Sequence, residues 1–212
     1  MNTVTGTACI QAYNARPSAG ESALQYPALG CQVLPATLTC LVGPHRLQLR
    51  DYLQMLAGIS IANQGKVEIF GQPTSNLDKL SMRKLRSQIG YLSGTAPLLS
   101  VQHGLMNVML PLLYHRNLSF RETADQARAL ISDLNCDFDP TIFPALLNSF
   151  QRAQLALARA LIMEPSLLFL DVPFHDLGAK QREEMGELLG KHIQHRAVCM
   201  IGGLQYPHFL EQ

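Results

Sequence analysis

Apolar residues along the chain alternate between short runs and a helical spacing. The run from Leu38 to Val42 predicts a strand, and Gly43-Pro44 separates it from apolar residues that recur at helical spacing over 52–59. The segment 65–71 then alternates with a period of two between glycines, which predicts a strand that ends in a turn. A polar helix over 80–87 and a strand around 89–92 are expected next.

The stretch from about 98 to 161 has a different, mostly helical pattern. Ser119 and Glu122 have the spacing of a capping box, and apolar residues at i, i+3 and i+4 follow them over 121–134. A second strong helix is expected over 152–163, before Glu164-Pro165. We therefore predict a helical lobe over about 98–161 that is inserted between strands.

The last part of the chain returns to alternation. An apolar strand over 167–170 leads into Asp171, a helix is expected over 179–192, and a buried strand over 197–201. Strands and helices that alternate around a helical insertion predict an α/β fold with a mainly parallel sheet. We expect residues 1–212 to form a single domain.

Composition narrows the class of protein. A length of 212 residues suits one large α/β domain better than two independent ones. Charged residues make up 16% of the chain, against roughly 25% in typical soluble domains, so part of the surface is expected to be covered by a partner. The formal net charge of +1 is too small for the basic footprint of a nucleic-acid binder, and no nucleic-acid partner is predicted.

The chain shows no signal for a membrane span, secretion or metal binding. No apolar run approaches the roughly 20 residues that a span requires, so direct membrane insertion is not expected. The first residues lack both a basic segment and an apolar core, which predicts a cytoplasmic location. The five cysteines lack CxxC spacing and the histidines do not pair with ligands at metal spacing, so neither a disulfide framework nor a metal site is predicted.

From about Thr37 to Gly203, the order of these segments resembles the ATPase domain of ATP-binding cassette (ABC) transporters. The pattern is most similar to the lipoprotein-release, macrolide-efflux and lipid-trafficking types. The resemblance implies a P-loop NTPase-like fold whose helical lobe is inserted in an α/β core. Six segments carry it in the family's order: LVGP (41–44), LQMLAG (53–58), IGYL (89–92), NVMLPLL (107–113), ALARAL (156–161) and LLFLD (167–171).

The phosphate loop keeps only the start of the family's G-x-x-x-x-G-K-[ST] motif. After Gly43 and Pro44, the places of the second glycine, the phosphate-binding lysine and the Mg²⁺-binding hydroxyl are taken by Gln48, Leu49 and Arg50. The resemblance therefore implies that the anion nest and its charge are lost.

Two arginines leave an alternative open at this loop. Arg46 or Arg50 could supply charge to an anion, and so form a rearranged nucleotide site with Gly43, Pro44 and Asp171. The opposing interpretation is that both are surface arginines that bind no ligand.

The remaining nucleotide motifs also depart from the family. Asp171 matches the Walker B aspartate, but Val172 stands where the family has the glutamate that acts as general base. Gly94 occupies the place of the Q-loop glutamine, and Gly203 that of the switch histidine. Because the neighbouring motif residues are replaced, Asp171 is interpreted as a strand-end residue without a ligand.

The signature segment, LSGGQ in the family, reads LNSFQ over 147–151. In the family this segment contacts the nucleotide held by the opposite subunit. Phe150 stands at one of the glycine positions, where its side chain fills the space for that nucleotide and restricts the backbone. The resemblance implies that the composite site of a head-to-tail dimer is damaged as well.

A partner surface is expected on the helical lobe. Met106, Met109, Leu110 and Leu113 resemble the surface that contacts a permease in the family, although a core stripe has the same spacing. Only nine residues follow Gly203, so the accessory strands and helix that usually close the domain are expected to be absent.

The leading prediction is a pseudo-ATPase, a non-catalytic subunit that docks on a membrane permease or a second ABC ATPase subunit and uses no cofactor. Its location would be cytoplasmic and peripheral to the cell membrane. Losing the lysine, hydroxyl, base, glutamine and histidine together removes the positioning, metal binding and proton acceptance that phosphoryl transfer requires. One alternative is an ATP-binding transport subunit with a rearranged site and with ATP and Mg²⁺ as cofactors. Another is a soluble scaffold or regulator.

Overall fold

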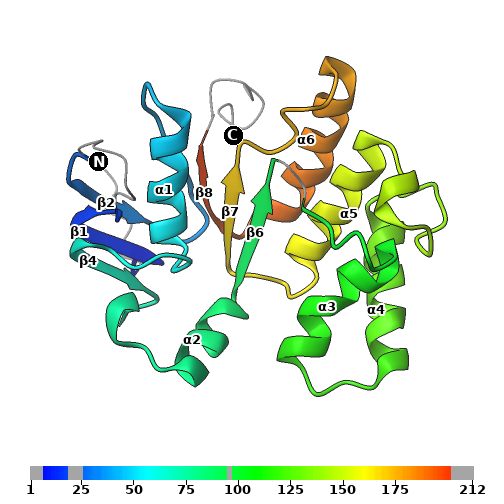
Figure 1. The fold of residues 1–212 in the computed structure, drawn as a ribbon, viewed down its shortest axis with the longest axis horizontal. Coiled ribbons are helices and arrows are strands. Elements are labelled where there is room, and N and C mark those ends of the chain that lie inside the picture. Colours follow the sequence, from blue (N-terminus) through cyan, green and yellow to red (C-terminus); the bar gives the residue numbers. More distant parts are fainter. Residues whose placement is uncertain (1–6, 19–25, 95–96, 202–212) are drawn as a thin grey trace.

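The computed structural model describes residues 7–18, 26–94 and 97–201. Strands and helices alternate along most of this length (Figure 1). In chain order the elements are β1 (Ile10–Arg16), β2 (Leu29–Val33), β3 (Leu38–Leu41), α1 (Arg46–Leu56), β4 (Gln64–Ile69), β5 (Gln72–Pro73), α2 (Lys79–Arg86), β6 (Ile89–Ser93), α3 (Gly104–His115), α4 (Phe120–Asp133), α5 (Ser149–Leu161), β7 (Leu167–Asp171), α6 (Ala179–Ile193) and β8 (Ala197–Ile201), with short 3-10 turns at Thr74–Asn76 and Pro144–Leu146.

Two four-stranded sheets form the α/β part of the molecule. One is parallel, with strand order β3-β8-β7-β6, and the other is antiparallel, with order β2-β1-β4-β5. In the parallel sheet Leu41 pairs with Ile201, while Asp171 pairs with Ile201 on one side and Ser93 on the other. The carboxyl ends of all four parallel strands therefore meet along one edge.

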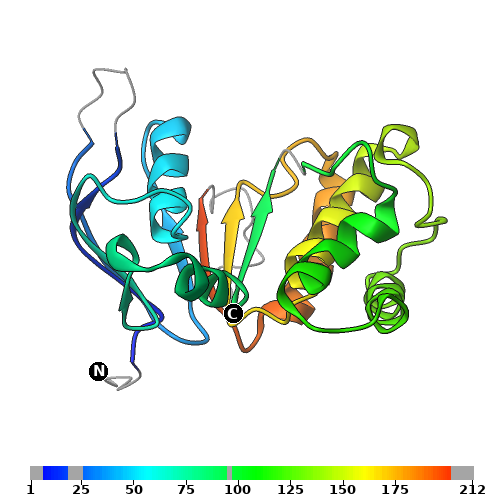
Figure 2. The same cartoon turned by 60° about the horizontal axis from the view of Figure 1, so that its bottom comes forward.

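Helices cover both faces of the parallel sheet. α1 lies between the two sheets, and α5 and α6 cover the opposite face (Figure 2). All five residues of β7 are buried, and its four apolar residues alternate between two hydrophobic clusters. Leu168 and Leu170 belong to the lobe-side cluster, whereas Leu167 and Phe169 belong to the cluster around α1. A continuous apolar run is what a parallel strand covered on both faces requires.

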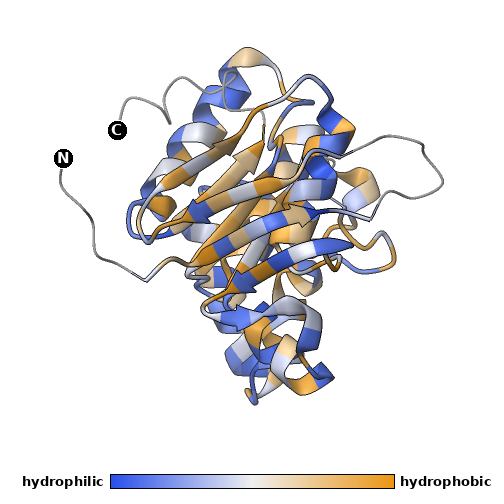
Figure 3. Cartoon of the chain, turned by 90° about the vertical axis from the view of Figure 1, so that its left-hand side faces the viewer, coloured by the Kyte–Doolittle hydropathy of each residue, from blue (hydrophilic) through white to orange (hydrophobic). Residues whose placement is uncertain are grey.

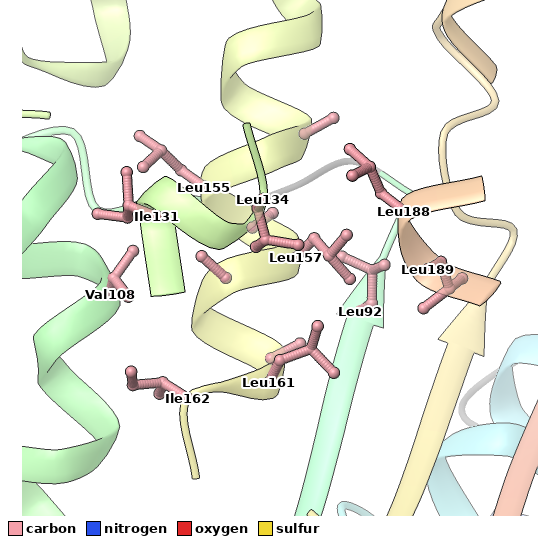
Figure 4. Packing of buried hydrophobic residues seen from close by; sticks show 14 of the residues in the cluster. Leu92, Val108, Ile131, Leu134, Leu155, Leu157, Leu161, Ile162, Leu188 and Leu189 are labelled. Carbon is pink, nitrogen blue, oxygen red and sulfur yellow. The ribbon is translucent and has the colours of Figure 1, made fainter. Parts of the chain in front are cut away.

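The predicted helical lobe is confirmed. α3, α4 and α5 pack around buried side chains that include Val108, Ile131 and Leu155 (Figure 4). Leu92 of β6 and Leu188 of α6 extend the same cluster to the sheet, so the lobe and the α/β core share one packed interior. None of the helices in the described part of the chain has the length and hydrophobicity needed to cross a bilayer.

Polar caps set where the lobe helices begin. The Ser119 hydroxyl accepts from the Glu122 backbone N–H, and the Glu122 carboxylate accepts from the Ser119 N–H at 2.8 Å, as the predicted capping box requires. A second capping box joins Asn148 and Gln151. It starts α5 at Ser149, ahead of the predicted position 152.

The antiparallel sheet is a departure from the sequence predictions, which placed no strands before residue 38 and included 65–71 in a mainly parallel arrangement. Figure 3 looks onto this sheet, where hydrophilic and hydrophobic residues alternate along the strands. A bulge in β1 disturbs that alternation: Asn14 has a φ of +45°, and the register shifts between Ala12 and Ala15, both of which are buried. The shift hides the period of two from the sequence.

Candidate functional site

The candidate site lies at the edge where the four parallel strands end. In α/β folds ligands bind at this edge, because the loops that follow the strands meet there. The loop after β3 brings Gly43 and Pro44 to it, α1 brings Arg46 and Arg50, and β7 brings Asp171. The structure thus gathers the predicted nucleotide-site residues in one region.

The most specific contact at this edge joins α1 to β7. Arg50 Nε donates a hydrogen bond to Asp171 Oδ2 over 2.7 Å, and the two groups form an ion pair. The Asp171 side chain is 2% exposed and the Arg50 side chain is 28% exposed. The interpretation of Arg50 as a free surface arginine is therefore corrected, whereas Asp171, interpreted as a residue without a ligand, has Arg50 as its ion-pair partner. The guanidinium reaches the carboxylate from the place where the family's motif has a hydroxyl.

Tyr91 is a further neighbour of Asp171 that the sequence did not indicate. Its hydroxyl lies 3.5 Å from Asp171 Oδ2, a weak hydrogen bond, and its ring stacks on Phe169 with 6.3 Å between centroids. Burial and the nearby Asp171 charge raise the pKa of Tyr91 far above its usual value, so its hydroxyl stays protonated. Asp171 Oδ1 is buried and has no hydrogen-bond partner among the described residues. Both contacts to this carboxylate thus converge on Oδ2.

The phosphate-loop segment is more helical than the family's motif implies. α1 begins at Arg46, and the Leu49 backbone N–H is already bonded to His45 O within the helix at 3.1 Å. The Leu49 side chain folds over the loop, since a Cβ added at Gly43 would lie 3.2 Å from Leu49 Cδ2. The positions at which an anion nest is expected therefore hold a helical turn and an aliphatic side chain.

Asp51 lies in the middle of α1, where its carboxylate accepts a hydrogen bond from the Tyr26 hydroxyl. That bond, together with burial, raises the pKa of Tyr26 to about 12. The Tyr26 ring packs edge-on against Tyr52 at 5.6 Å. Asp51 therefore anchors the segment before β2 to α1.

The outer side of the loop combines two aliphatic side chains with His45 and Arg46. Val42 is 71% exposed and Leu47 is 72% exposed. Arg46 is also exposed, and within the described residues it has no hydrogen bond or ion pair, which fits the surface interpretation. The loop therefore presents aliphatic surface where the family's motif presents glycine and lysine.

A groove of about 650 Å³ separates this loop from the ends of β7 and β8. Its lining contains basic side chains and no acidic one: Gly43, Pro44, Arg46, Leu49, Val172, His175, Arg182 and Ile201. His175 Nε2 lies 2.9 Å from Asp176 Oδ1, so part of its charge, when protonated, is offset. The lining attracts anions weakly and does not attract cations.

The backbone beside Asp171 leaves no room for a side chain at position 94. Gly94 N donates to Asp171 O over 2.8 Å, and a Cβ at 94 would lie 2.3 Å from Val172 O and 2.5 Å from His175 Nδ1. Val172 is buried and has a φ of +45°, which β-branched residues rarely adopt. Gly203, predicted at the place of the switch histidine, lies outside the described residues.

The signature-like segment forms the start of α5. Asn148 and Gln151 cap the helix reciprocally, and Arg152 Nη2 donates to Ser149 Oγ over 3.1 Å. Phe150 packs against the lobe cluster. The polar side chains of this segment are therefore engaged within their own helix start.

The residues predicted to contact a permease differ in how exposed they are in the structure. Met109 is fully buried in the lobe cluster, so its assignment as a contact residue is corrected: at this position the helical spacing serves the core. Met106 packs against the same cluster and is partly exposed. Leu110 is partly exposed and Leu113 is 38% exposed, so these two can reach a partner.

The charges at the strand ends come from Arg50 and Asp171, while Leu49 brings none. A divalent cation at Asp171 would meet the positive charge of Arg50, and Leu49 offers no charge to a phosphate. Among the residues that the structure describes, no group of three or more His, Cys, Asp and Glu side chains could hold a metal ion. The arrangement holds α1 against β7 through the Arg50–Asp171 pair.

Comparison with known proteins agrees with the order of the motifs. The family described as ABC transporter matches residues 52–175, more than half of the chain. The uncharacterized ABC transporter ATP-binding protein YbbA of Escherichia coli is 32% identical over 150 residues, which cover 70% of this chain and 65% of that protein, slightly less than two thirds of its length. The lipoprotein-releasing system ATP-binding protein LolD 1 of Rhodopirellula baltica is 29% identical over 174 residues, which cover 82% and 76% respectively.

A solved structure matches the fold over nearly the whole chain. The dimeric structure of MJ0796, described as a bacterial ABC transporter cassette, superposes with a TM-score of 0.84 at 21% identity, over 94% of this chain and 90% of that chain. At this identity the likeness concerns the fold alone. It confirms the predicted class, an α/β cassette of the P-loop NTPase type with a parallel sheet and a helical lobe.

Proposed function

Because this chain belongs to the ABC transporter family, we propose that it is a non-catalytic subunit of a membrane transporter, a pseudo-ATPase that uses neither ATP nor Mg²⁺ as a cofactor. Its fold then serves as a docking module for a permease, for a second ABC ATPase subunit, or for both. In this role the chain lies in the cytoplasm, at the inner face of the membrane.

The Arg50–Asp171 ion pair carries this proposal. A guanidinium 2.7 Å from the Walker B carboxylate supplies the positive charge that a bound metal ion would otherwise supply there. The pair is intramolecular, so it is present at every nucleotide concentration. A metal ion at Asp171 would have to share the carboxylate with the Arg50 guanidinium and would be repelled by its charge.

Three neighbouring positions support the same conclusion. Leu49 closes over Gly43 where a lysine would reach a phosphate. Val172 is buried among apolar side chains where the family's general base would stand, and valine cannot accept a proton. Gly94 is pressed against backbone and cannot be replaced by glutamine without movement of the chain. Phosphoryl transfer depends on all of these functions together.

The first prediction concerns nucleotide binding and hydrolysis by the unchanged protein. Calorimetric titration with MgATP is expected to give no binding in the micromolar range, and a phosphate-release assay no turnover, since Leu49 brings no charge into the loop and Arg50 neutralises the Asp171 carboxylate. An intact family member measured in parallel shows that the assay works. Micromolar binding would instead favour the alternative of a rearranged site at Arg46.

The second prediction is that restoring single motif residues does not restore hydrolysis. Leu49→Lys returns a charge without a base, and Val172→Glu returns a base without a phosphate-binding loop, so both variants are expected to remain inactive. Val172→Glu also places a carboxylate in an apolar cluster and should lower the melting temperature. Phosphate release by either variant would mean that the other positions are compensated.

The third prediction concerns assembly. ATP joins two cassettes only if both halves of the composite site are built, and here the signature-like segment is committed to capping α5. We expect the molar mass from light scattering to be the same with and without MgATP. Dimers that form only on adding MgATP would contradict the proposed function, because closure would then use the very groups that the proposal treats as missing. A protein that binds no permease at all would favour the scaffold alternative.

A further inference from the structure

The segment that forms β2 and β3 carries no charged residue. Residues 22–44 contain no Asp, Glu, Lys or Arg, although these residue types make up 16% of the chain. Each of the two strands is the terminal strand of its sheet, β2 in the antiparallel sheet and β3 in the parallel one. Terminal strands usually carry charged residues, prolines or bulges that prevent pairing with strands of other molecules. An uncharged edge is therefore unusual for a surface that stays in water.

The two ends of the antiparallel sheet are protected to different degrees. β5, at one end, has only two residues and contains Pro73, so it offers almost no ladder to a further strand. β2, at the other end, has five residues and no proline. On its inner side Cys31 pairs with Ala12 of β1, and among the described residues no strand pairs with its outer side. That outer side can therefore accept an additional strand.

The sequence around β2 is symmetric about Cys31. Leu29 and Val33 lie two residues before and after it, and Pro27 and Pro35 lie four residues before and after it. If two such strands run antiparallel about a twofold axis at Cys31, Leu29 of one copy faces Val33 of the other. The prolines, which cannot donate to a ladder, then face each other beyond the paired residues. The segment is therefore complementary to itself.

The exposed face of β2 suits the same pairing. Gly30 and Gln32 are exposed, whereas the residues that alternate with them are partly or fully buried. A twofold axis at Cys31 places Gln32 of one copy opposite Gly30 of the other, so the longer side chain meets a position that has none. Because neither strand carries a charge, the two edges approach each other without like-charge repulsion.

We propose that two copies of this chain pair through β2, antiparallel and about a twofold axis at Cys31, and so join their antiparallel sheets into one. Twofold contacts are the commonest in homodimers, because one self-complementary surface serves both copies. In Figure 1 the antiparallel sheet lies on the side of the molecule away from the helical lobe. The contact goes beyond the proposed function, because it requires neither nucleotide nor permease and leaves the lobe uncovered.

Light scattering over a range of protein concentrations, under reducing conditions and without MgATP, tests for this dimer. The apparent molar mass is expected to rise twofold, from one chain to two, as the concentration increases. Five paired residues bury little surface, so dilution should separate the copies. Gly30→Lys combined with Gln32→Lys places like charges opposite each other across the twofold axis, and this variant should stay monomeric.

Gln64→Lys combined with Gln72→Lys is the matched control. Both residues are exposed, on β4 and β5, so this variant adds the same charge to the same sheet away from β2. It should dimerise like the unchanged protein. A Cβ at Gly30 would lie 4.0 Å from its nearest neighbour, the Ala12 backbone oxygen, so a lysine there fits the folded monomer. Circular dichroism of both variants verifies that they are folded.

Oxidative crosslinking tests the register independently of the added charges. Residues directly opposite in an antiparallel pair have Cα atoms about 4.5 to 5.5 Å apart, within the range that a disulfide bridges. Burial raises the pKa of the Cys31 thiol, so the oxidant, copper–phenanthroline, is added at alkaline pH. Non-reducing electrophoresis should show a band of twice the mass. The band should be lost in Cys31→Ser and kept in Cys136→Ser, which changes a partly buried cysteine beside the lobe cluster.

Three results would overturn the β2 contact: one chain at every concentration, a dimer that persists in the variant with lysines at 30 and 32, or a crosslink that persists in Cys31→Ser. If the lysine variant does not fold, the crosslinking experiment decides alone. None of these measurements involves ATP hydrolysis or permease binding. Failure of the β2 contact is thereby distinguishable from failure of the pseudo-ATPase assignment.

Discussion

Replacing Arg50 by methionine is expected to lower the free energy of unfolding by about 3 kcal/mol, the lower end of the range for breaking a buried ion pair. The variant leaves the Asp171 carboxylate buried with no cation beside it, and only the weak hydrogen bond from Tyr91 remains. Because Arg50 is partly exposed, water can screen some of this charge, and we expect a value below the upper end of that range. Urea denaturation of both proteins measures the difference.

A double-mutant cycle separates the ion pair from simple loss of packing. Arg50→Met combined with Asp171→Leu removes both charges, and it should recover most of the lost stability because apolar pairs of similar volume often replace buried ion pairs at little cost. Arg50→Lys keeps the charge and should be intermediate. A loss below about 1 kcal/mol for Arg50→Met alone would place the pair among screened surface contacts, and the main support of the proposed function would be gone.

Replacing Gly94 by glutamine, the residue that the family's Q-loop has there, is expected to destabilise the protein by roughly 3 kcal/mol, at the upper end for inserting atoms into a packed interior. The new Cβ would lie 2.3 Å from the Val172 carbonyl oxygen, and backbone cannot move aside as a flexible side chain can. A fall in the melting temperature measured by calorimetry, without any gain of phosphate release, is the expected result.

Gly190→Gln is the matched control for this change. Gly190 lies in α6, and a Cβ there would have no atom within 4 Å, so the same substitution should stabilise the helix by about 0.5 to 1 kcal/mol through helix propensity. A Gly94→Gln protein as stable as the Gly190→Gln protein would mean that the backbone around Asp171 rearranges readily, and the exclusion of a Q-loop side chain would then be wrong.

Periodicity predicted most of the fold because the central elements follow a regular pattern. β8 matches its predicted range, and α4 begins at its predicted capping box. β1 escaped prediction because the bulge at Asn14 breaks the period of two, and β2 was missed although its five residues alternate between apolar and polar. The predicted start of α1 was too late. The motif of the resembled family indicated a loop at Gln48, Leu49 and Arg50, whereas these residues belong to the helix.

The candidate site could be located from the sequence but not assembled. The motif order placed Arg50 and Asp171 in the same region, yet a separation of 121 residues hides whether two side chains touch. Nothing in the sequence marked Tyr91 as a neighbour of Asp171, because this contact depends on the pairing of β6 with β7. The burial of Met109 was equally hidden, since helical spacing identifies an apolar stripe without saying which side is covered.

The strand order β3-β8-β7-β6 has a consequence for how the protein is made. β3 lies far before β8 in the chain but pairs with it, so this edge of β3 stays open on the ribosome until the residues up to Ile201 have emerged. Such long-range closure is slow, because the entropy of the intervening loop is lost before the contacts form. The apolar layer between β3 and α1 is incompletely covered until then, and this exposed layer makes the nascent chain prone to aggregation.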